Sequence, residues 1–201
     1  MTRKLIVLTL VAAFGLSVAG VASANWFNVI RGTKDADVLT GTDNRDFILG
    51  LAGDDQISAA GARDVVRAGK GNDTVDGGAG LDGLIGGPGD DTLNAGDDGA
   101  VMWGGAGNDT LNASDSGRNI LHGGPGDDSV NGGAGRDRLW GGRGADTLNG
   151  GDGNDVLHSL AADGQVDSLD CGPGDHDVAW VRAGEPDTVV NCEVVKTVSA
   201  S

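Results

Sequence analysis

The chain has 201 residues, enough for one domain or two small ones, and 38 of them are glycine while only 3% are aromatic. A conventional packed core needs large side chains, so this composition argues against an ordinary helical or α/β globule. The formal net charge is −16, and all but two of the 30 acidic residues are aspartate. Aspartate beside glycine is typical of turns and of oxygen-ligand metal sites. The acidity also argues against a nucleic-acid partner, because such binding depends on basic contacts to phosphate.

The first 24 residues form a segment of a different kind. Arg3 and Lys4 precede an apolar stretch that runs from Leu5 to about Val21, and small residues follow at 22–24. This order is typical of a secretory signal peptide and its cleavage site. A membrane anchor is the alternative, but it is weakened by the small-residue pattern and by the lack of a flanking stop-transfer charge. We therefore expect a secreted, extracellular protein with no membrane span.

The two cysteines, Cys171 and Cys192, would then lie in an oxidising compartment, where a disulfide persists. Closing a loop of this length would stabilise the fold by about 3 kcal/mol. A zinc site is the rival interpretation. It is weaker because two lone cysteines lack the CxxC pair that zinc sites usually contain.

A nine-residue period runs from Gly32 to His158 and comprises fourteen rows. Its clearest rows include GGAGLDGLI from Gly77, GGPGDDTLN from Gly86 and GGAGNDTLN from Gly104. The rows before Gly77 are looser, and two internal rows, 95–103 and the ten-residue 113–122, have lost the motif. Nine rows carry Gly at position 4 together with Asp at position 6, and position 8 is apolar in all fourteen. A low-complexity linker predicts no such periodic apolar position.

The repeat has a direct structural interpretation. Its first six residues, GGxGxD, predict a turn that needs positive φ, and the next three predict a short strand whose middle residue faces inward. Two rows make one coil, and stacked coils pair their strands in parallel around a thin core between two sheets. Fourteen rows therefore predict an all-β solenoid of seven coils, roughly 34 Å long at about 4.8 Å per strand step.

Rows such as GGPGDDTLN resemble the RTX, or haemolysin-type calcium-binding, nonapeptide repeat. The resemblance covers about residues 32–158 and implies a right-handed parallel β-roll. It also implies that Ca²⁺ binds between turns on the same side, through the position-6 Asp and backbone carbonyls of the glycine turns. Calcium takes six or more hard oxygens, which stacked Asp turns can supply.

The aspartates that the resemblance marks as calcium ligands are Asp55, Asp73, Asp82, Asp91, Asp109, Asp128, Asp137, Asp146 and Asp155. Three further aspartates hold position 6 without the position-4 glycine, which puts a metal role for them in doubt: Asp37, Asp46 and Asp64. Alternate rows lie on opposite sides of the roll. We expect one side to carry a continuous ladder of about five calcium sites, and the other to be interrupted at Ala100 and Arg118.

The residues after 158 leave the period and resemble the C-terminal cap of some secreted RTX-like proteins, with one cysteine at each end. The predicted organisation is a signal peptide at 1–24, a calcium-binding roll with an N-terminal cap at 25–158, and a disulfide-linked C-terminal β cap at 159–201. A solenoid needs such caps because its last strands would otherwise have unpaired edges. Trp26 and Trp180 are expected to pack in these caps.

No HExxH, GxSxG or P-loop motif is present, and repeats and caps fill the mature chain. We therefore expect a secreted calcium-binding module that acts by binding or at a surface, and not an enzyme. The alternative is a carbohydrate- or polymer-active enzyme on a calcium-stabilised solenoid. A third hypothesis, an ice-binding roll, would need a flat exposed array of threonines.

Position 9 of the even-numbered strands predicts an exposed, largely apolar row on one face of the roll. Its members are Leu49, Arg67, Ile85, Trp103, Leu121, Trp140 and His158. Soluble monomers rarely leave such a stripe bare, and tryptophan is favoured at interaction hot spots. The face that carries Trp103 and Trp140 is therefore predicted to contact a protein, a polysaccharide or a second copy of the chain. The alternative is that both tryptophans lie flat over their neighbours and are only structural.

Overall fold

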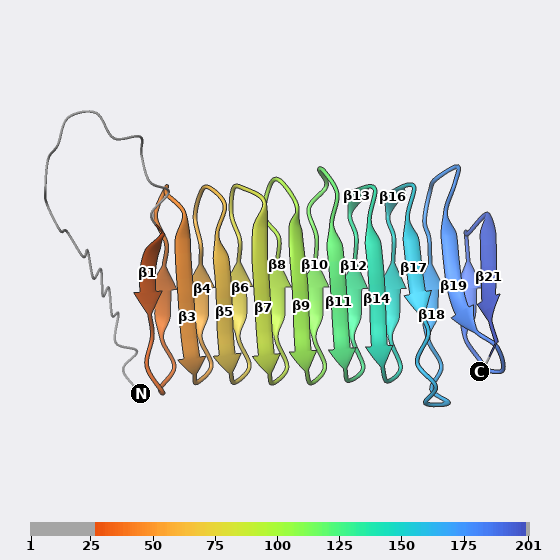
Figure 1. The fold of residues 1–201 in the computed structure, drawn as a ribbon, viewed down its shortest axis with the longest axis horizontal. Coiled ribbons are helices and arrows are strands. Elements are labelled where there is room, and N and C mark those ends of the chain that lie inside the picture. The colour runs from red at the N-terminus through yellow and green to blue at the C-terminus, as the bar shows by residue number, and fades with distance from the viewer. Residues whose placement is uncertain (1–26, 200–201) are drawn as a thin grey trace, which may run out of the picture.

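The structure is a computed structural model that describes residues 27–199 and consists of two long parallel β-sheets (Figure 1). The predicted signal peptide and Trp26 lie outside the described residues. Successive strands alternate between the two sheets, so each strand pairs in parallel with the strand one coil away. Within the described range, no helix is long and apolar enough to cross a bilayer.

The ten-stranded sheet contains β1 (Asn28–Arg31), β3 (Asp46–Ala52), β5 (Val65–Lys70), β7 (Asp82–Pro88), β9 (Ala100–Ala106), β11 (Ile120–Pro125), β14 (Arg138–Arg143), β17 (Val156–Ser159), β19 (Val178–Arg182) and β21 (Val194–Val198). The nine-stranded sheet contains β2 (Val38–Thr40), β4 (Gln56–Ser58), β6 (Thr74–Asp76), β8 (Thr92–Asn94), β10 (Thr110–Asn112), β12 (Ser129–Asn131), β15 (Thr147–Asn149), β18 (Ser168–Asp170) and β20 (Thr188–Val190). A small third sheet pairs β13 (Ala134–Gly135) with β16 (Asp152–Gly153).

The core lies between the two sheets, and both sheets contribute inward side chains to it. Position 8 supplies most of the large ones, and Leu84, Leu93, Met102 and Leu111 are fully buried. The residues on either side of each inward residue point to solvent, as the pleat of a strand requires. The expected all-β parallel solenoid is confirmed.

Glycine is required in the turns because consecutive coils approach closely there. Gly87 has a φ of 131°, and a Cβ at this position would collide with the carbonyl oxygen of Gly69 in the coil before it. No L-residue with a side chain fits such a position without strain. The glycine-rich half of the repeat is therefore explained by backbone packing between coils.

The stack has more coils than expected, because the strands after residue 158 continue both sheets. β18 and β20 extend the nine-stranded sheet, and β19 and β21 extend the ten-stranded one. The nine-residue period is lost in this part because the turns are longer, yet the strands still pair in register. A disulfide joins Cys171 to Cys192 in adjacent coils, as predicted for the C-terminal part of the chain.

The ten-residue row at 113–122 has a different register from the one expected. Ile120 pairs with Val101 and His122 pairs with Trp103, so the extra residue lies in the turn before β11. Leu121 is therefore an inward core residue, and assigning it to the outward row was wrong; His122 lies there instead. The insertion falls in the turn because a shift within the strand would turn its core residue outward.

Candidate metal sites in the turns

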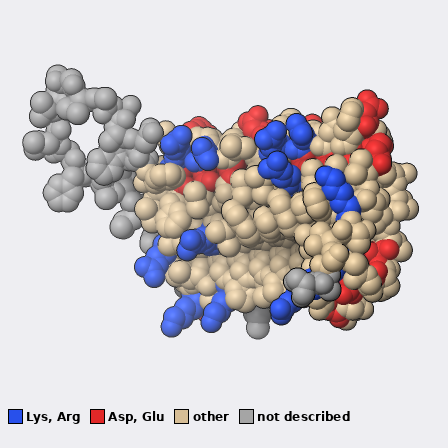
Figure 2. Space-filling model, turned by 45° about the vertical axis from the view of Figure 1, so that its right-hand side comes forward, with Lys and Arg blue, Asp and Glu red and all other residues tan. Residues whose placement is uncertain are grey.

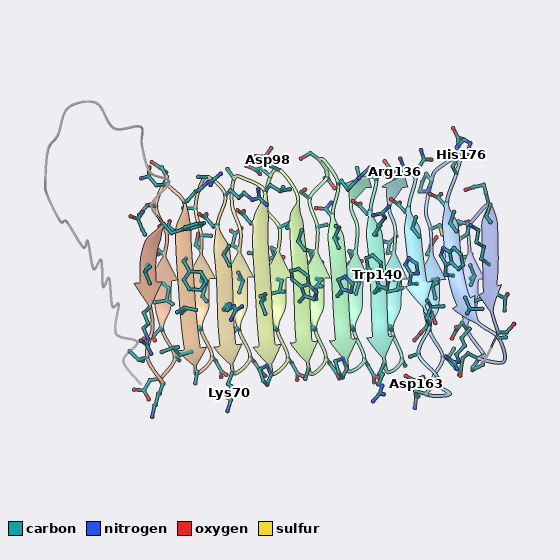
Figure 3. The ribbon with its side chains drawn as sticks, in the orientation of Figure 1. Lys70, Asp98, Arg136, Trp140, Asp163 and His176 are labelled. Carbon is teal, nitrogen blue, oxygen red and sulfur yellow. A yellow bond between two sulfur atoms is a disulfide. The ribbon has the colours of Figure 1, made fainter. Side chains whose placement is uncertain are left out.

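The position-6 aspartates line up along the two edges of the stack. The first turn column leads into the nine-stranded sheet and contains Asp37, Asp55, Asp73, Asp91, Asp109, Asp128, Asp146, Asp167 and Asp187. The second turn column leads into the ten-stranded sheet and contains Asp46, Asp64, Asp82, Ala100, Asn119, Asp137, Asp155, Asp177 and Glu193. Figure 3 shows Lys70, the last residue of β5, beside the first column at the lower edge, and Asp98 and Arg136 in turns of the second column at the upper edge.

One carboxylate oxygen of each aspartate in the columns accepts a hydrogen bond from a backbone N–H. The Asp73 N–H donates to Oδ1 of Asp91 at 2.8 Å, and the Asp91 N–H donates to Oδ1 of Asp109 at 2.8 Å. The same bond joins each coil of the first column to the next, from Asp37 to Asp187. In every pair the aspartate of the earlier coil donates its N–H to the aspartate of the next coil, so these bonds link the turns along the whole column.

The other carboxylate oxygen has no donor in eleven of the aspartates. In each of them Oδ2 is buried and accepts no hydrogen bond: Asp55, Asp64, Asp73, Asp82, Asp91, Asp109, Asp128, Asp137, Asp146, Asp155 and Asp177. A buried, unpaired carboxylate oxygen is costly, and repeating it along two columns multiplies the cost. A cation or a proton must therefore compensate these positions.

Backbone oxygens lie beside the unpaired Oδ2 atoms. A Cβ added to Gly86 would collide with Oδ2 of Asp91 and with the carbonyl oxygen of Gly104, one coil further on. Within residues 27–199, no three His, Cys, Asp or Glu side chains converge on one point, so backbone carbonyls must complete any ligand set. A set made only of carboxylate and carbonyl oxygens fits a hard cation such as Ca²⁺.

Comparison with known families gives the same assignment. The family model of the RTX calcium-binding nonapeptide repeat matches residues 27–57, 58–93, 85–115, 103–138, 114–148, 122–157 and 132–166. Together these segments cover residues 27–166. The chain belongs to the RTX calcium-binding nonapeptide repeat family. A search of curated proteins gave no match.

The RTX turns also change the acidity of their aspartates. Burial raises the pKa of Asp91 and of Asp128 to about 7, and the pKa of Asp55 to about 6, while the backbone N–H that each carboxylate accepts opposes the rise. Neighbouring carboxylates raise these pKa values further. The pKa of Asp82 and of Asp137 rises to about 7 for the same main reason. Protons and metal ions must therefore compete for these oxygens near neutral pH.

The second RTX column is interrupted in its middle, whereas the first has no gap. Ala100 has no side-chain oxygen, so the Asp82 N–H donates its hydrogen bond to the carbonyl oxygen of Gly99 instead. Asn119, and not Arg118, holds the next position: its Oδ1 accepts the N–H of Ala100 at 2.9 Å. The expectation of an arginine in this slot was wrong, because the inserted residue places Arg118 in the turn.

Charges on the outer side of the turns also distinguish the two columns. In the first column, position 5 carries alternating acidic and amide residues joined by hydrogen bonds, such as the Asn72 N–H to Oδ1 of Asp54 at 2.9 Å and the Asp90 N–H to Oδ1 of Asn72 at 3.0 Å. In the second column, Arg63 and Arg136 occupy this position and are exposed. The first column therefore has the more negative potential and is the better cation site.

All nine aspartates named from the sequence lie in these columns with an unpaired Oδ2. Asp64, which the sequence left in doubt, shares this feature, whereas Oδ2 of Asp37 and of Asp46 accepts a backbone N–H from a threonine at 2.6 Å. Asp177 was missed. The segment CGPGDHD carries a signal that could have found it, since it is a repeat turn with one extra residue before the aspartate.

Proposed function

We propose that this protein is a secreted β-roll that folds around Ca²⁺ and acts as a binding or surface-associated module, without catalytic activity. The observation that carries the proposal is the set of eleven buried Oδ2 atoms that lack a donor beside backbone carbonyls. Calcium bound there would supply positive charge where the carboxylates crowd together. Binding and folding would then be coupled, because the unfolded chain holds no such site.

Secretion and the lack of catalysis are supported by other features. The apolar leader at 1–24 and the Cys171–Cys192 disulfide both suit an exported protein. The buried aspartates recur as equivalents in coil after coil, whereas an active site needs one distinct constellation of residues. A structural role for these carboxylates therefore accounts for their number and their spacing.

The test compares two neighbouring aspartates that differ in burial. Asp91→Asn removes the unpaired oxygen and keeps the Oδ1 acceptor, while Asp90→Asn makes the same charge change at an exposed position. We expect Asp91→Asn to raise the Ca²⁺ concentration at the midpoint of folding several-fold, as measured by far-UV circular dichroism. Asp90→Asn should raise it clearly less, because it removes a charge that adds to the negative potential of the column but no buried ligand oxygen. Equal midpoints for the two variants, or a full β spectrum in excess chelator at pH 8, would contradict the proposal.

A further inference from the structure

Five aromatic rings form a continuous stack on the outward face of the ten-stranded sheet. We call Trp103, His122, Trp140, His158 and Trp180 the aromatic row. Consecutive ring centroids are 5.9, 4.3, 4.7 and 6.2 Å apart, and the planes differ by no more than 8°. Lys196 extends the row, with its Nζ 4.5 Å from the ring centroid of Trp180. Trp140 marks the middle of the row in Figure 3.

The stacking leaves the edges of the rings, and not their faces, available to a ligand. Each inner ring is covered on both faces by its neighbours, so a sugar cannot lie flat on it. The edge of an aromatic ring carries partial positive charge, and the indole N–H is a hydrogen-bond donor. A row of such edges therefore favours a negatively charged or hydrogen-bond-accepting ligand.

The charged residues around the aromatic row also favour a negatively charged ligand. Neither of the two outward positions is acidic in any of the ten strands, although the chain has 30 acidic residues. Arg31, Arg67, Arg138 and Lys196 are exposed on this face, and the remaining outward residues are mostly valine, isoleucine, leucine and phenylalanine. Burial lowers the pKa of both His122 and His158, so the positive charge comes from these four residues. In Figure 2, uncharged residues cover the middle of the visible surface, and both basic and acidic residues lie towards its margins.

The dimensions of the face suit a long, thin ligand. Three residues across a strand span about 10 Å, and nine steps between ten strands span about 43 Å. The strip therefore offers roughly 400 Å², about half of the 800 Å² that each partner of a standard protein interface buries. A second copy of the chain would also bring like charges together. One extended polymer chain lying along the stack fits both the width and the charge.

We propose that the outward face of the ten-stranded sheet binds an anionic polysaccharide along the aromatic row. The anionic groups, carboxylate or sulfate, would pair with Arg67, Arg138 and the other two cations, while ring edges and apolar side chains contact the sugar backbone. This inference rests on the proposed function, because the strip exists only in the folded, calcium-loaded roll. It names the class of partner that the roll would bind.

The test uses the calcium-loaded protein and two polymers that differ only in charge. Dextran sulfate is compared with uncharged dextran of the same length, and hyaluronate serves as the carboxylate polymer, so that the source of the anionic group can be distinguished. Three of the four tryptophans lie in the aromatic row, so their fluorescence reports contact directly. We expect at least one anionic polymer to bind and to weaken with added salt, and dextran not to bind.

Two matched variants locate the contact. Arg67→Gln with Arg138→Gln removes two charges from the strip, whereas Arg63→Gln with Arg136→Gln removes two exposed charges from the turns of the second column. Because each exposed ion pair contributes modestly, the first variant should bind about five- to thirtyfold more weakly, and the second should bind nearly as well as the wild type. Circular dichroism with Ca²⁺ shows that each variant is folded before it is titrated.

A third variant, Trp103→Ser with Trp140→Ser, removes ring edges without changing charge and should also weaken binding. Equal loss in both arginine variants would mean unspecific attraction and would overturn the proposal. Equal binding of dextran, binding only to anionic lipid vesicles, or self-association that the strip variants abolish would overturn it as well. If Ca²⁺ does not fold the wild-type protein, the proposed function itself is wrong. If the protein folds with Ca²⁺ but binds no anionic polymer, only the inference about the aromatic row is wrong.

Discussion

The buried carboxylates make the fold of the metal-free protein dependent on pH. The pKa of Asp91 is about 7 in the folded chain, against an ordinary value of 3.8, because burial disfavours its charge. Each pKa unit corresponds to about 1.4 kcal/mol, so ionising Asp91 in the folded, metal-free state costs on the order of 4 kcal/mol. Several equivalents together exceed the roughly 5 to 15 kcal/mol by which a domain is stable. The metal-free chain should therefore be unfolded at pH 8.

The sign of the effect follows from the direction of the shift. A folded pKa above the unfolded one means that folding is favoured when the carboxyl is protonated, fully so below about pH 4. This advantage is lost as the pH rises through the folded values of about 6 to 7. In chelator, we expect the β signal to increase as the pH falls from 8 towards 5. Over the same range, the Ca²⁺ concentration needed to saturate the folded roll should rise below about pH 7, because protons occupy the ligand oxygens.

Far-UV circular dichroism in chelator at several pH values tests this reasoning. Measurements should stop near pH 5 and be accompanied by light scattering, because the sequence isoelectric point is about 4.2 and aggregation would imitate a β signal. A metal-free β spectrum that is equally strong at pH 8 and pH 5, or stronger at pH 8, would refute it.

Three further predictions concern the calcium-loaded roll. Gly87→Ala should lower the free energy of unfolding by more than about 2 kcal/mol in a denaturant titration, because the positive φ of this residue and the Gly69 carbonyl of the preceding coil leave no room for a Cβ. Gly83→Ala, at an open position, should change the free energy of unfolding little in the same titration. Leu93→Ala leaves a cavity in the thin core and should lower the free energy of unfolding by about 2 to 5 kcal/mol, as measured by thermal unfolding. Val194→Ala, at a position 42% exposed in the last strand, should lower it by less than about 1 kcal/mol in the same thermal unfolding experiment. Cys192→Ser should cost about 3 kcal/mol, and a reductant should destabilise the wild type but not this variant.

The repeated parts of the fold could be predicted from the sequence. Most of the rows carry their own turn glycines, their own inward residue and their own aspartate. The local pattern within a row therefore predicts the strand, the core residue and the ligand oxygen. Asp91 and Leu93 could therefore be assigned without knowledge of the neighbouring coil. The disulfide between Cys171 and Cys192 also followed, from the expected compartment and from the resemblance of the C-terminal region.

Only the tertiary structure decided what happens where the period breaks. Pairing with a coil about eighteen residues away places Asn119 and not Arg118 in the turn column, and it turns His122 outward between Trp103 and Trp140. The same pairing carries the stack beyond residue 158, through turns of irregular length. Strand register is set by hydrogen bonds to the neighbouring coil and by the one inward side chain, whereas a turn can absorb an inserted residue. The period of the sequence therefore determines the repeating coil, and contacts between coils determine which side chains meet.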